Sequence, residues 1–267
     1  MPVDIEARVI SNTRLSADYN VIALAAPEIA SVANPGQFVM VKPGRGYDPM
    51  LRRPFSVFEI LRADGRIVGL SILSKRVGTT TGLLFDAREG DTVACLGPLG
   101  RPFTVVEPPK EAWMVAGGVG LAPFATLAEA LLAAGTKTTL FYGARSGCEL
   151  FYLDWFKSRG VTLALATEDG SVGDKGRISI PLTRSLEAAR PGSAMVYACG
   201  PEPMLEAVAQ LASRYEQPCE VSVEQVMGCG MGGCYSCVIA VRTDTGPHYV
   251  RSCLAGPVFD GEELVWH

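Results

Sequence analysis

The first hundred or so residues alternate short apolar, β-branched segments with clusters of turn-forming residues. Asn34-Pro35-Gly36 and Ala63-Asp64-Gly65 are two such turns. The segments are too short for core helices, and six of them predict antiparallel strands. Their ranges are 6–10, 19–25, 37–42, 55–60, 67–73 and 91–96. Six short strands at this spacing predict a small antiparallel β-barrel domain over residues 1–106.

The pattern changes after Val106-Glu107-Pro108-Pro109, which we interpret as a linker. Short apolar strands now alternate with helical segments, which predicts a parallel sheet covered on both faces. The expected strands are 113–116, 138–142, 161–166 and 194–198, and the expected helices follow residue 120 and span 152–159 and 202–215. We therefore predict an α/β domain over residues 107–218.

From residue 219 to residue 267 the chain is short and rich in glycine and cysteine. Such a segment cannot bury much core of its own, so a metal cluster would have to stabilise it. The predicted organisation is thus a β-barrel, then a parallel-sheet domain, then a small metal-binding segment.

Composition narrows the possible partners and the location. Hydrophobic residues make up 48% and charged residues 19% of the chain, which predicts globular packing. The net charge is −4 without a lysine- or arginine-rich run, which argues against a nucleic-acid partner. The apolar run 121–134 is broken by Pro123 and Glu129 and is too short to span a membrane. The N-terminus lacks a basic region leading into an apolar stretch, so we expect a cytoplasmic protein.

Four of the eight cysteines are clustered near the C-terminus with the spacing C-x4-C-x2-C-x15-C: Cys229, Cys234, Cys237 and Cys253. In a reducing cytosol, clustered cysteines indicate metal ligands before disulfides. The spacing is that of a plant-type [2Fe–2S] loop, and the intervening glycines permit N–H groups to approach the sulfurs. A four-cysteine zinc site is the alternative, although zinc sites favour paired C-x2-C knuckles. The four scattered cysteines are mostly expected to be buried small residues.

Two short motifs in the barrel region are candidate phosphate and flavin contacts. Arg53-Pro54-Phe55-Ser56 combines a guanidinium suited to a pyrophosphate with a hydroxyl able to bond a ring nitrogen. Gly78-Thr79 opens an expected helix whose N–H groups could hold phosphate. Each motif alone is equally compatible with an ordinary turn or helix start.

The α/β region carries two candidate nucleotide contacts. Gly117, Gly118 and Gly120 form a glycine-rich turn between a strand and a helix, where a pyrophosphate could approach the helix N-terminus. Cys199-Gly200-Pro201 follows another strand, at the end where open sheets bind ligands. The alternatives are a tight strand–helix connection and a buried cysteine. Glu168-Asp169-Gly170 follows a further strand and either accepts hydrogen bonds from a ribose or is a solvated turn.

In this order, the motifs resemble those of the ferredoxin–NADP reductase superfamily, in which a flavin-binding barrel precedes a nicotinamide domain. The resemblance implies that FAD is bound by Arg53, Pro54, Phe55 and Ser56, by Leu70, Ser71 and Ile72, and by Gly78 and Thr79. It also implies that the nicotinamide dinucleotide is bound by Gly117, Gly118, Gly120, Cys199, Gly200 and Pro201, with Cys199 near the reactive ring.

The added cluster motif, from Glu224 to Cys237, is similar to that of electron-transfer subunits of class 1B dihydroorotate dehydrogenases. The sequence departs from the family pattern at two places. Phe55 stands where many relatives have tyrosine, and the gap before Cys253 is shorter than in plant ferredoxins. The motifs barely separate this family from the small subunits of bifurcating NADH-dependent ferredoxin:NADP oxidoreductases and of anaerobic sulfite reductases.

The family resemblance implies a function in electron transfer and pyrimidine biosynthesis. Electrons would pass between NAD(H), FAD and a [2Fe–2S] cluster, and to or from a flavin-containing catalytic subunit of the dihydroorotate dehydrogenase type in a hetero-oligomer. A rival of another class is a non-catalytic nucleotide-binding module whose tail is held by structural zinc.

Overall fold

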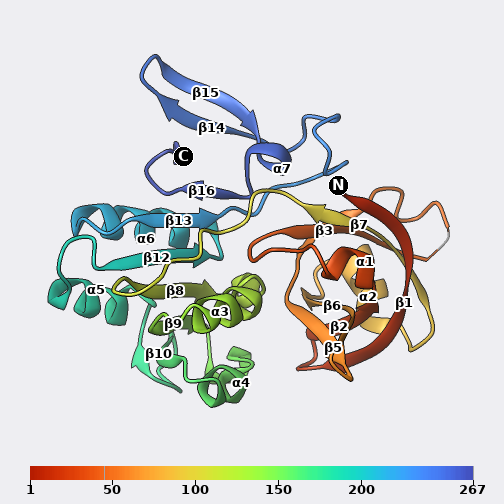
Figure 1. Ribbon diagram of the computed structural model, residues 1–267, viewed down its shortest axis with the longest axis horizontal. Coiled ribbons are helices and arrows are strands. Elements are labelled where there is room, and N and C mark those ends of the chain that lie inside the picture. Colours follow the sequence, from red (N-terminus) through yellow and green to blue (C-terminus); the bar gives the residue numbers. More distant parts are fainter. Residues whose placement is uncertain (45, 267) are drawn as a thin grey trace.

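The computed structural model describes residues 1–44 and 46–266 and shows two sheet-based lobes, with a C-terminal hairpin lying above them (Figure 1). Residues up to Leu99 form the strands of one lobe, and strands from Glu111 onward form the other. The C-terminal segment, in blue, contacts both lobes. No described helix is long and apolar enough to cross a membrane.

The first lobe is a curled antiparallel sheet of seven strands in the order β4-β3-β7-β1-β2-β6-β5. The strands are β1 (Val3–Arg14), β2 (Tyr19–Ala25), β3 (Phe38–Pro43), β4 (Arg53–Ser56), β5 (Glu59–Ala63), β6 (Arg66–Lys75) and β7 (Thr92–Leu99). Two helices accompany them, α1 (Pro27–Ala30) and α2 (Thr79–Asp86). The predicted antiparallel barrel is confirmed as a half-barrel, because the order begins at β4 and ends at β5 in the described chain.

The strand expected at 55–60 is two strands, because the chain changes partners in the middle. Val57 donates its N–H to the carbonyl of Gln37, whereas Phe58 donates to the carbonyl of Ser71. The chain thereby leaves β3 and joins β6. Both Val57 and Phe58 are fully buried, so this change of partner lies inside the core of the molecule.

The second lobe is a seven-stranded sheet in the order β11-β10-β9-β8-β12-β13-β16. Its strands are β8 (Glu111–Gly117), β9 (Thr138–Ala144), β10 (Thr162–Thr167), β11 (Asp174–Lys175), β12 (Ala194–Cys199), β13 (Cys219–Ser222) and β16 (Val258–Asp260). Neighbours pair in parallel except β13 and β16, which are antiparallel. The predicted parallel sheet with covering helices is confirmed.

Helices connect these strands and cover the sheet (Figure 1). They are α3 (Phe124–Ala133), α4 (Leu153–Ser158), α5 (Ser179–Ala188) and α6 (Glu202–Arg214), with single 3₁₀ turns at η1 (Gly118–Leu121) and η2 (Gly147–Glu149). Helix α3 begins after Pro123 and buries most of its apolar residues. It ends before Gly135, whose φ of 76° is in the left-handed region that favours glycine.

The C-terminal segment leaves the sheet after β13 and returns to it at β16. Between them lie the cysteine loop, the hairpin β14 (Val238–Thr243) and β15 (Gly246–Arg251), and the short helix α7 (Ser252–Ala255). The hairpin packs on the α/β lobe through Ile239, Val241 and Val250. The predicted metal-binding segment is therefore joined to the parallel sheet at both of its ends.

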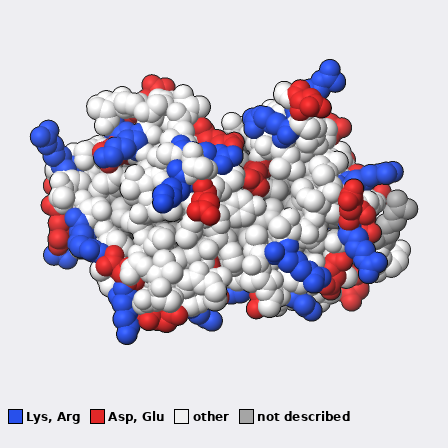
Figure 2. Space-filling view, turned by 90° about the horizontal axis from the view of Figure 1, so that it is seen from below, with Lys and Arg blue, Asp and Glu red and all other residues white. Residues whose placement is uncertain are grey.

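Charged side chains of both signs are interspersed on the face seen in Figure 2, with uncharged surface between them. No large field of a single sign dominates that face, in agreement with the modest net charge of −4. Such a distribution gives little long-range attraction for a polyanion approaching this face.

Candidate functional site

The two glycine motifs of the α/β lobe meet at the carboxyl ends of adjacent strands. Strands β8 and β12 pair in register with Cys199 opposite Ala116. A side chain at Gly120 would overlap the carbonyl oxygen of Cys199, and one at Gly117 would lie 2.7 Å from the Met204 sulfur. Gly120 therefore requires glycine because the two turns pack against each other there, and Gly117 lies close to Pro201 and Met204. The structure brings together all six residues predicted to face the dinucleotide.

Cys199 is partly exposed as a residue, but its thiol is enclosed by protein and is neutral. Burial raises the pKa of this thiol to about 12, and the negative charge of Glu224 raises it further, while a hydrogen bond with Ser222 lowers it. An un-ionised thiol is a weak nucleophile. Cys199 is accordingly suited to packing against an aromatic ring or a neutral group rather than to covalent chemistry.

Ser222 and Glu224 were not among the predicted site residues. Ser222 ends β13, which lies beside β12, and Glu224 follows two residues later. The signal that could have found them is their position: a polar residue just past the carboxyl end of a parallel strand borders the ligand-binding edge of the sheet.

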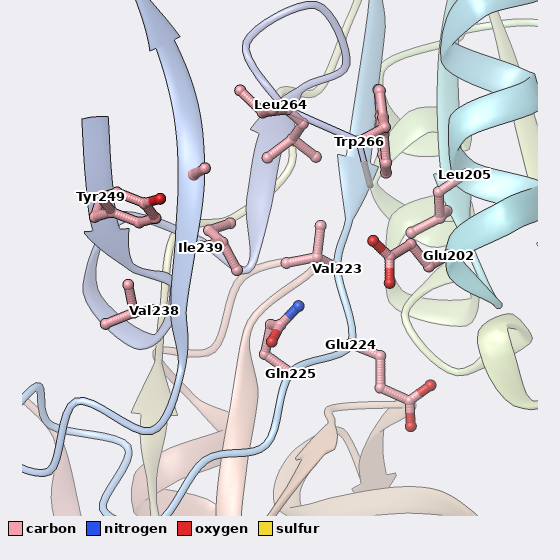
Figure 3. A pocket seen from close by; sticks show the side chains of 12 residues that line it. Glu202, Leu205, Val223, Glu224, Gln225, Val238, Ile239, Tyr249, Leu264 and Trp266 are labelled. Atoms are coloured by element: carbon pink, nitrogen blue, oxygen red, sulfur yellow. The ribbon is translucent and has the colours of Figure 1, made fainter. Parts of the chain in front are cut away.

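Beside Glu224 lies a cavity of about 300 Å³ between α6, residues 223–225 and the hairpin (Figure 3). Glu202 and Leu205 from α6 lie on one side, and Val238, Ile239 and Tyr249 from the hairpin lie on the other. Apolar side chains and polar groups both line its walls. The carboxylates of Glu202 and Glu224 make the cavity unfavourable for an anion.

The barrel motif Arg53-Pro54-Phe55-Ser56 coincides with β4, an edge strand. An edge position accommodates Pro54, which cannot donate a ladder hydrogen bond. Arg53 is exposed, and its guanidinium donates to the carbonyls of Leu51 and Arg52 at 3.2 and 3.0 Å. Phe55 and Ser56 are partly exposed, as flavin contacts would require.

Gly78 and Thr79 lie at the start of α2 and are exposed. The Thr81 hydroxyl oxygen accepts hydrogen bonds from the N–H groups of Val77 and Gly78 at 2.8 and 2.9 Å. Leu70, Ser71 and Ile72, by contrast, are almost completely buried in β6, and the Ser71 hydroxyl donates to Glu59 at 2.9 Å. A contribution of these three residues to flavin binding stays a prediction.

The four clustered cysteines influence one another electrostatically, and their thiols differ in pKa. Hydrogen bonds from Ser236 and Cys229 lower the pKa of Cys234 to about 6, whereas burial and the neighbouring Cys237 raise the pKa of Cys253 to about 12. Cys234 thus interacts with Cys229, whereas Cys253 is influenced by both Cys237 and Cys229. Within the described residues, no group of three or more histidine, cysteine or carboxylate side chains converges on a single metal position.

The four free thiols match the ligand set of a dinuclear cluster. A [2Fe–2S] cluster takes four thiolates, two at each iron, whereas structural zinc needs four ligands around one point. The loop also directs N–H groups at sulfur: Met231 and Gly233 donate to the Cys229 sulfur at 3.4 and 3.2 Å. Such donors stabilise anionic sulfur.

The cysteine loop packs directly on the half-barrel beside the β4 motif. Cys237 and Cys253 are buried with Phe38 and Met40 of β3 and with Leu96 and Leu99 of β7. Met40 is paired in register with Pro54 of β4, and a side chain at Gly230 would lie 2.5 Å from Met40. The predicted flavin motif and the predicted cluster ligands are far apart in sequence but both contact β3, the first by strand pairing and the second by side-chain packing.

Comparison with known proteins agrees with this arrangement. The family described as "Iron-sulfur cluster binding domain of dihydroorotate dehydrogenase B" matches residues 224–265, and "Oxidoreductase NAD-binding domain" matches residues 114–210. A solved NADH-dependent reduced ferredoxin-NADP oxidoreductase superimposes with a TM-score of 0.84 at 29% identity, covering 97% of this chain and 90% of that one. The fold and site define an NAD-linked oxidoreductase of the ferredoxin reductase type.

Curated relatives specify the family. An electron transfer subunit of dihydroorotate dehydrogenase B (NAD(+)) from Desulforamulus reducens is 34% identical over 98% of both chains. Its counterpart from Geobacillus kaustophilus is 37% identical over 97% of this chain and 98% of its own length. The chain belongs to the family of electron transfer subunits of dihydroorotate dehydrogenase B.

Proposed function

We propose that this chain transfers electrons between NAD(H) and a flavin-containing dihydroorotate dehydrogenase subunit, through its own FAD and a [2Fe–2S] cluster. One observation carries the proposal. The cysteine loop packs on β3 where that strand pairs with the Arg53–Ser56 motif, which brings the two expected redox sites next to each other. Adjacent sites of this kind suit electron transfer from one carrier to the next.

In this proposal the residues of the α/β lobe hold the dinucleotide. Gly117 and Gly120 let the turn after β8 pack closely on its neighbours, Gly118 leaves space there for the pyrophosphate, and Cys199, Gly200 and Pro201 border the nicotinamide. The neutral Cys199 thiol gives the ring an uncharged neighbour. The predicted boundaries, 1–106, 107–218 and 219–267, assign most of this lobe to the second domain and its strands β13 and β16 to the third.

The residues of the half-barrel would hold the flavin. Arg53, Gly78 and Thr79 are exposed and suited to its pyrophosphate, and Phe55 and Ser56 to its ring, with Pro54 fixing the edge strand. Leu70, Ser71 and Ile72 would support it from within β6. When bound, a flavin accepts an electron pair and releases electrons singly, and a [2Fe–2S] cluster at Cys229, Cys234, Cys237 and Cys253 carries them one at a time.

A partner surface surrounds the cysteine loop. The segment Cys229–Cys237 has no charged side chain. Large apolar side chains around it are exposed: Val226 (77%), Met231 (60%), Tyr235 (64%), Tyr249 (70%) and Leu254 (52%). Exposed apolar surface of this extent next to a redox site favours docking of a partner subunit. Burial there would also shorten the distance between the carriers of the two subunits. The clustered reduced cysteines support a cytoplasmic location.

A second candidate function is the small subunit of a bifurcating NADH-dependent ferredoxin-NADP oxidoreductase. The superposition on such an enzyme, at a TM-score of 0.84, favours it. The two candidates share the dinucleotide, flavin and cluster sites. They differ in the partner subunit.

Reconstitution with the partner tests the proposal. Anaerobically purified protein should contain about two irons and two labile sulfides per chain, with flavin and without stoichiometric zinc. Alone it should reduce small dyes with NADH and leave dihydroorotate untouched. With the flavin-containing dihydroorotate dehydrogenase subunit of the same source it should co-elute on a sizing column and couple dihydroorotate oxidation to NAD reduction.

Each alternative gives a different result. A chain that couples only to a bifurcating large subunit would support the second candidate. A colourless protein with one zinc per chain would contradict electron transfer altogether and indicate a nucleotide-binding module with a structural metal.

A further inference from the structure

Arg251 joins the C-terminal hairpin to the cysteine loop. It is the last residue of β15, and helix α7, which contains Cys253, begins directly after it (Figure 1). Its guanidinium donates a hydrogen bond to the carbonyl of Gly232 at 2.7 Å and lies over the Tyr235 ring, 4.8 Å from the centroid. Gly232 precedes Cys234 and Tyr235 follows it. One side chain therefore holds the loop on both sides of a predicted cluster ligand.

The carbonyl that accepts from Arg251 belongs to the same peptide unit as the N–H of Gly233. That N–H donates to the Cys229 sulfur at 3.2 Å. The peptide unit therefore has a guanidinium at its oxygen and a predicted ligand sulfur at its nitrogen. A donor at the carbonyl strengthens the hydrogen bond that the N–H donates, because hydrogen bonds in a chain polarise one another. Arg251 thus acts on the Cys229 sulfur through one peptide unit.

Packing also fixes the backbone of the loop at this point. Gly232 has a φ of 79°, in the left-handed region that favours glycine. A side chain there would lie 2.5 Å from the Leu254 side chain and 3.4 Å from the Arg251 guanidinium. Leu254 and Arg251 therefore lie directly against the loop, and the carbonyl of Gly232 stays within reach of its donor.

The charge of Arg251 is directed at this loop. The segment Cys229–Cys237 has no charged side chain of its own. Among the described residues, no second charged side chain hydrogen-bonds with it. No carboxylate in the described part of the chain forms an ion pair with Arg251, which is half-buried. The guanidinium is therefore shared between a loop carbonyl and the Tyr235 ring rather than neutralised by an acid.

Hydrogen bonds to the ligand sulfurs help to set the reduction potential of an iron–sulfur cluster. Reduction makes the sulfurs more negative, so an N–H donor stabilises the reduced form more than the oxidised form. We propose that Arg251 is a positioning residue that raises the reduction potential of the [2Fe–2S] cluster, by fixing and polarising the peptide unit that donates to Cys229. This role of Arg251 rests on the proposed function and adds the residue that sets how readily an electron passes from the flavin to the cysteine loop.

Arg251→Met tests this role, because methionine keeps an unbranched apolar stem but has neither the donor nor the charge. The anaerobically purified protein is titrated in the presence of redox mediators, and the EPR signal of the reduced cluster gives its midpoint potential. Arg251→Met should lower the equilibrium constant for one-electron reduction about tenfold, which is a fall of about 59 mV. Its iron content and the midpoint potential of its flavin should stay at the wild-type values. A smaller fraction of the cluster should then be reduced at equilibrium with NADH.

Two further variants separate the hydrogen bond from the net charge. Arg242→Met is the matched control, since Arg242 is an exposed arginine on the other strand of the same hairpin, and it should leave both potentials unchanged. Arg251→Lys keeps a charged donor without the planar fork, so its cluster potential should lie between those of wild type and Arg251→Met. If Arg251→Met does not retain iron, Arg251→Lys decides: a lowered potential supports the role of Arg251, and an unchanged one overturns it.

The remaining outcomes are also decisive. An intact cluster with an unchanged potential in Arg251→Met overturns the role of Arg251 and leaves the proposed function standing. An equal fall in Arg242→Met overturns it as well, because the shift would then follow from net charge alone. Loss of iron from both Arg251 variants would show that this residue is needed to assemble the loop rather than to set a potential. Wild-type protein that holds zinc and no labile sulfide contradicts the proposed function itself.

Discussion

The molecule contains two glycine-rich segments beside cysteines, and they are built in opposite ways. In the segment Gly117–Leu121, Gly120 is required by contact, since a side chain there would overlap the backbone of Cys199. In the cysteine loop, Gly233 has nothing within 4 Å of where its side chain would stand. The first segment is closed by its own protein neighbours, whereas part of the second is open to solvent or to a partner.

The cysteines of the two segments also differ, in the pKa of their thiols. The Cys199 thiol has a pKa of about 12 because burial disfavours its charge, whereas Cys234 has a pKa of about 6 because Ser236 and Cys229 donate hydrogen bonds to it. A similar composition thus gives a neutral thiol at Cys199 and an acidic thiol at Cys234. The two thiols differ in pKa because their burial and the hydrogen-bond donors around them differ, although the residue type is the same.

The largest effect is expected when one cluster ligand is removed. Cys234→Ser should lose the iron and abolish reduction of one-electron protein acceptors, because a [2Fe–2S] cluster needs four thiolates. NADH oxidation with a two-electron dye should largely survive in the folded variant. Iron analysis and the two assays measure this, and Cys148→Ser, an exposed cysteine outside the loop, is the control. Equal loss of both activities in a folded protein would mean that the cluster is not downstream of the flavin.

The contrast between Gly120 and Gly233 predicts that their alanine variants differ strongly in stability. Gly120→Ala forces the turn away from Cys199 and should cost about 3 kcal/mol of stability, with loss of NADH oxidation. Gly233→Ala should cost less than about 1 kcal/mol, because its side chain enters open space. Denaturant unfolding and dye reduction measure both. Comparable losses in the two variants would remove the distinction between a closed and an open segment.

A smaller effect is expected at the half-barrel. Arg53→Ala should purify with less flavin, and its flavin dissociation constant should rise about tenfold to a hundredfold, since charge-assisted hydrogen bonds contribute about 1.5–3 kcal/mol each. Arg14→Ala removes an exposed arginine whose carboxylate partner is Asp86 and should keep its flavin. Absorbance spectra give the flavin content. Full occupancy in Arg53→Ala would place this residue outside the flavin site, where its contacts are only the carbonyls of Leu51 and Arg52.

The smallest expected effect concerns how the reactivity of the Cys199 thiol changes with pH. Because burial raises its pKa to about 12, the thiol stays protonated at and below neutral pH and gains thiolate only as the pH approaches that value. Alkylation of Cys199 in the folded protein should therefore be negligible from about pH 6 to about pH 9 and become rapid after unfolding, when the thiol regains an ordinary pKa. Peptide mapping by mass spectrometry measures this. Rapid modification near neutral pH would show that the Cys199 thiol is not held in its neutral form.

The sequence predicted the lobes and their order because each has its own hydrophobic pattern. The strand at 19–25 agrees residue for residue with β2. The strand expected at 55–60 is split, because Val57 and Phe58 are both apolar and buried, and an apolar run does not reveal a change of pairing partner. Helix α5 was not predicted, since Pro181 in its first turn interrupts the helical signal and few of its residues are buried.

The candidate site was partly predictable because some of its signals are local in the sequence. Glycines at tight turns and cysteines at fixed spacing are local signals, and the structure brings the members of each motif together. The contact between the cysteine loop and β3 is not local: Gly230 and Met40 are 190 residues apart, and neither carries chemistry that points to the other. Ser222 and Glu224 were missed because their place beside Cys199 depends on the order of strands in the sheet.

The pairing of β13 with β16 has a consequence for engineering. Ser222 and Val258 face each other across an antiparallel ladder, so residues 223–257 form an insertion whose two ends are adjacent. A two-residue Asn-Gly turn is the natural link between antiparallel neighbours. Replacing the insertion by such a turn would give a shortened, iron-free reductase that keeps both sheets. The excision would uncover Phe38, Met40, Leu96 and Leu99, so polar substitutions on β3 and β7 would have to accompany it.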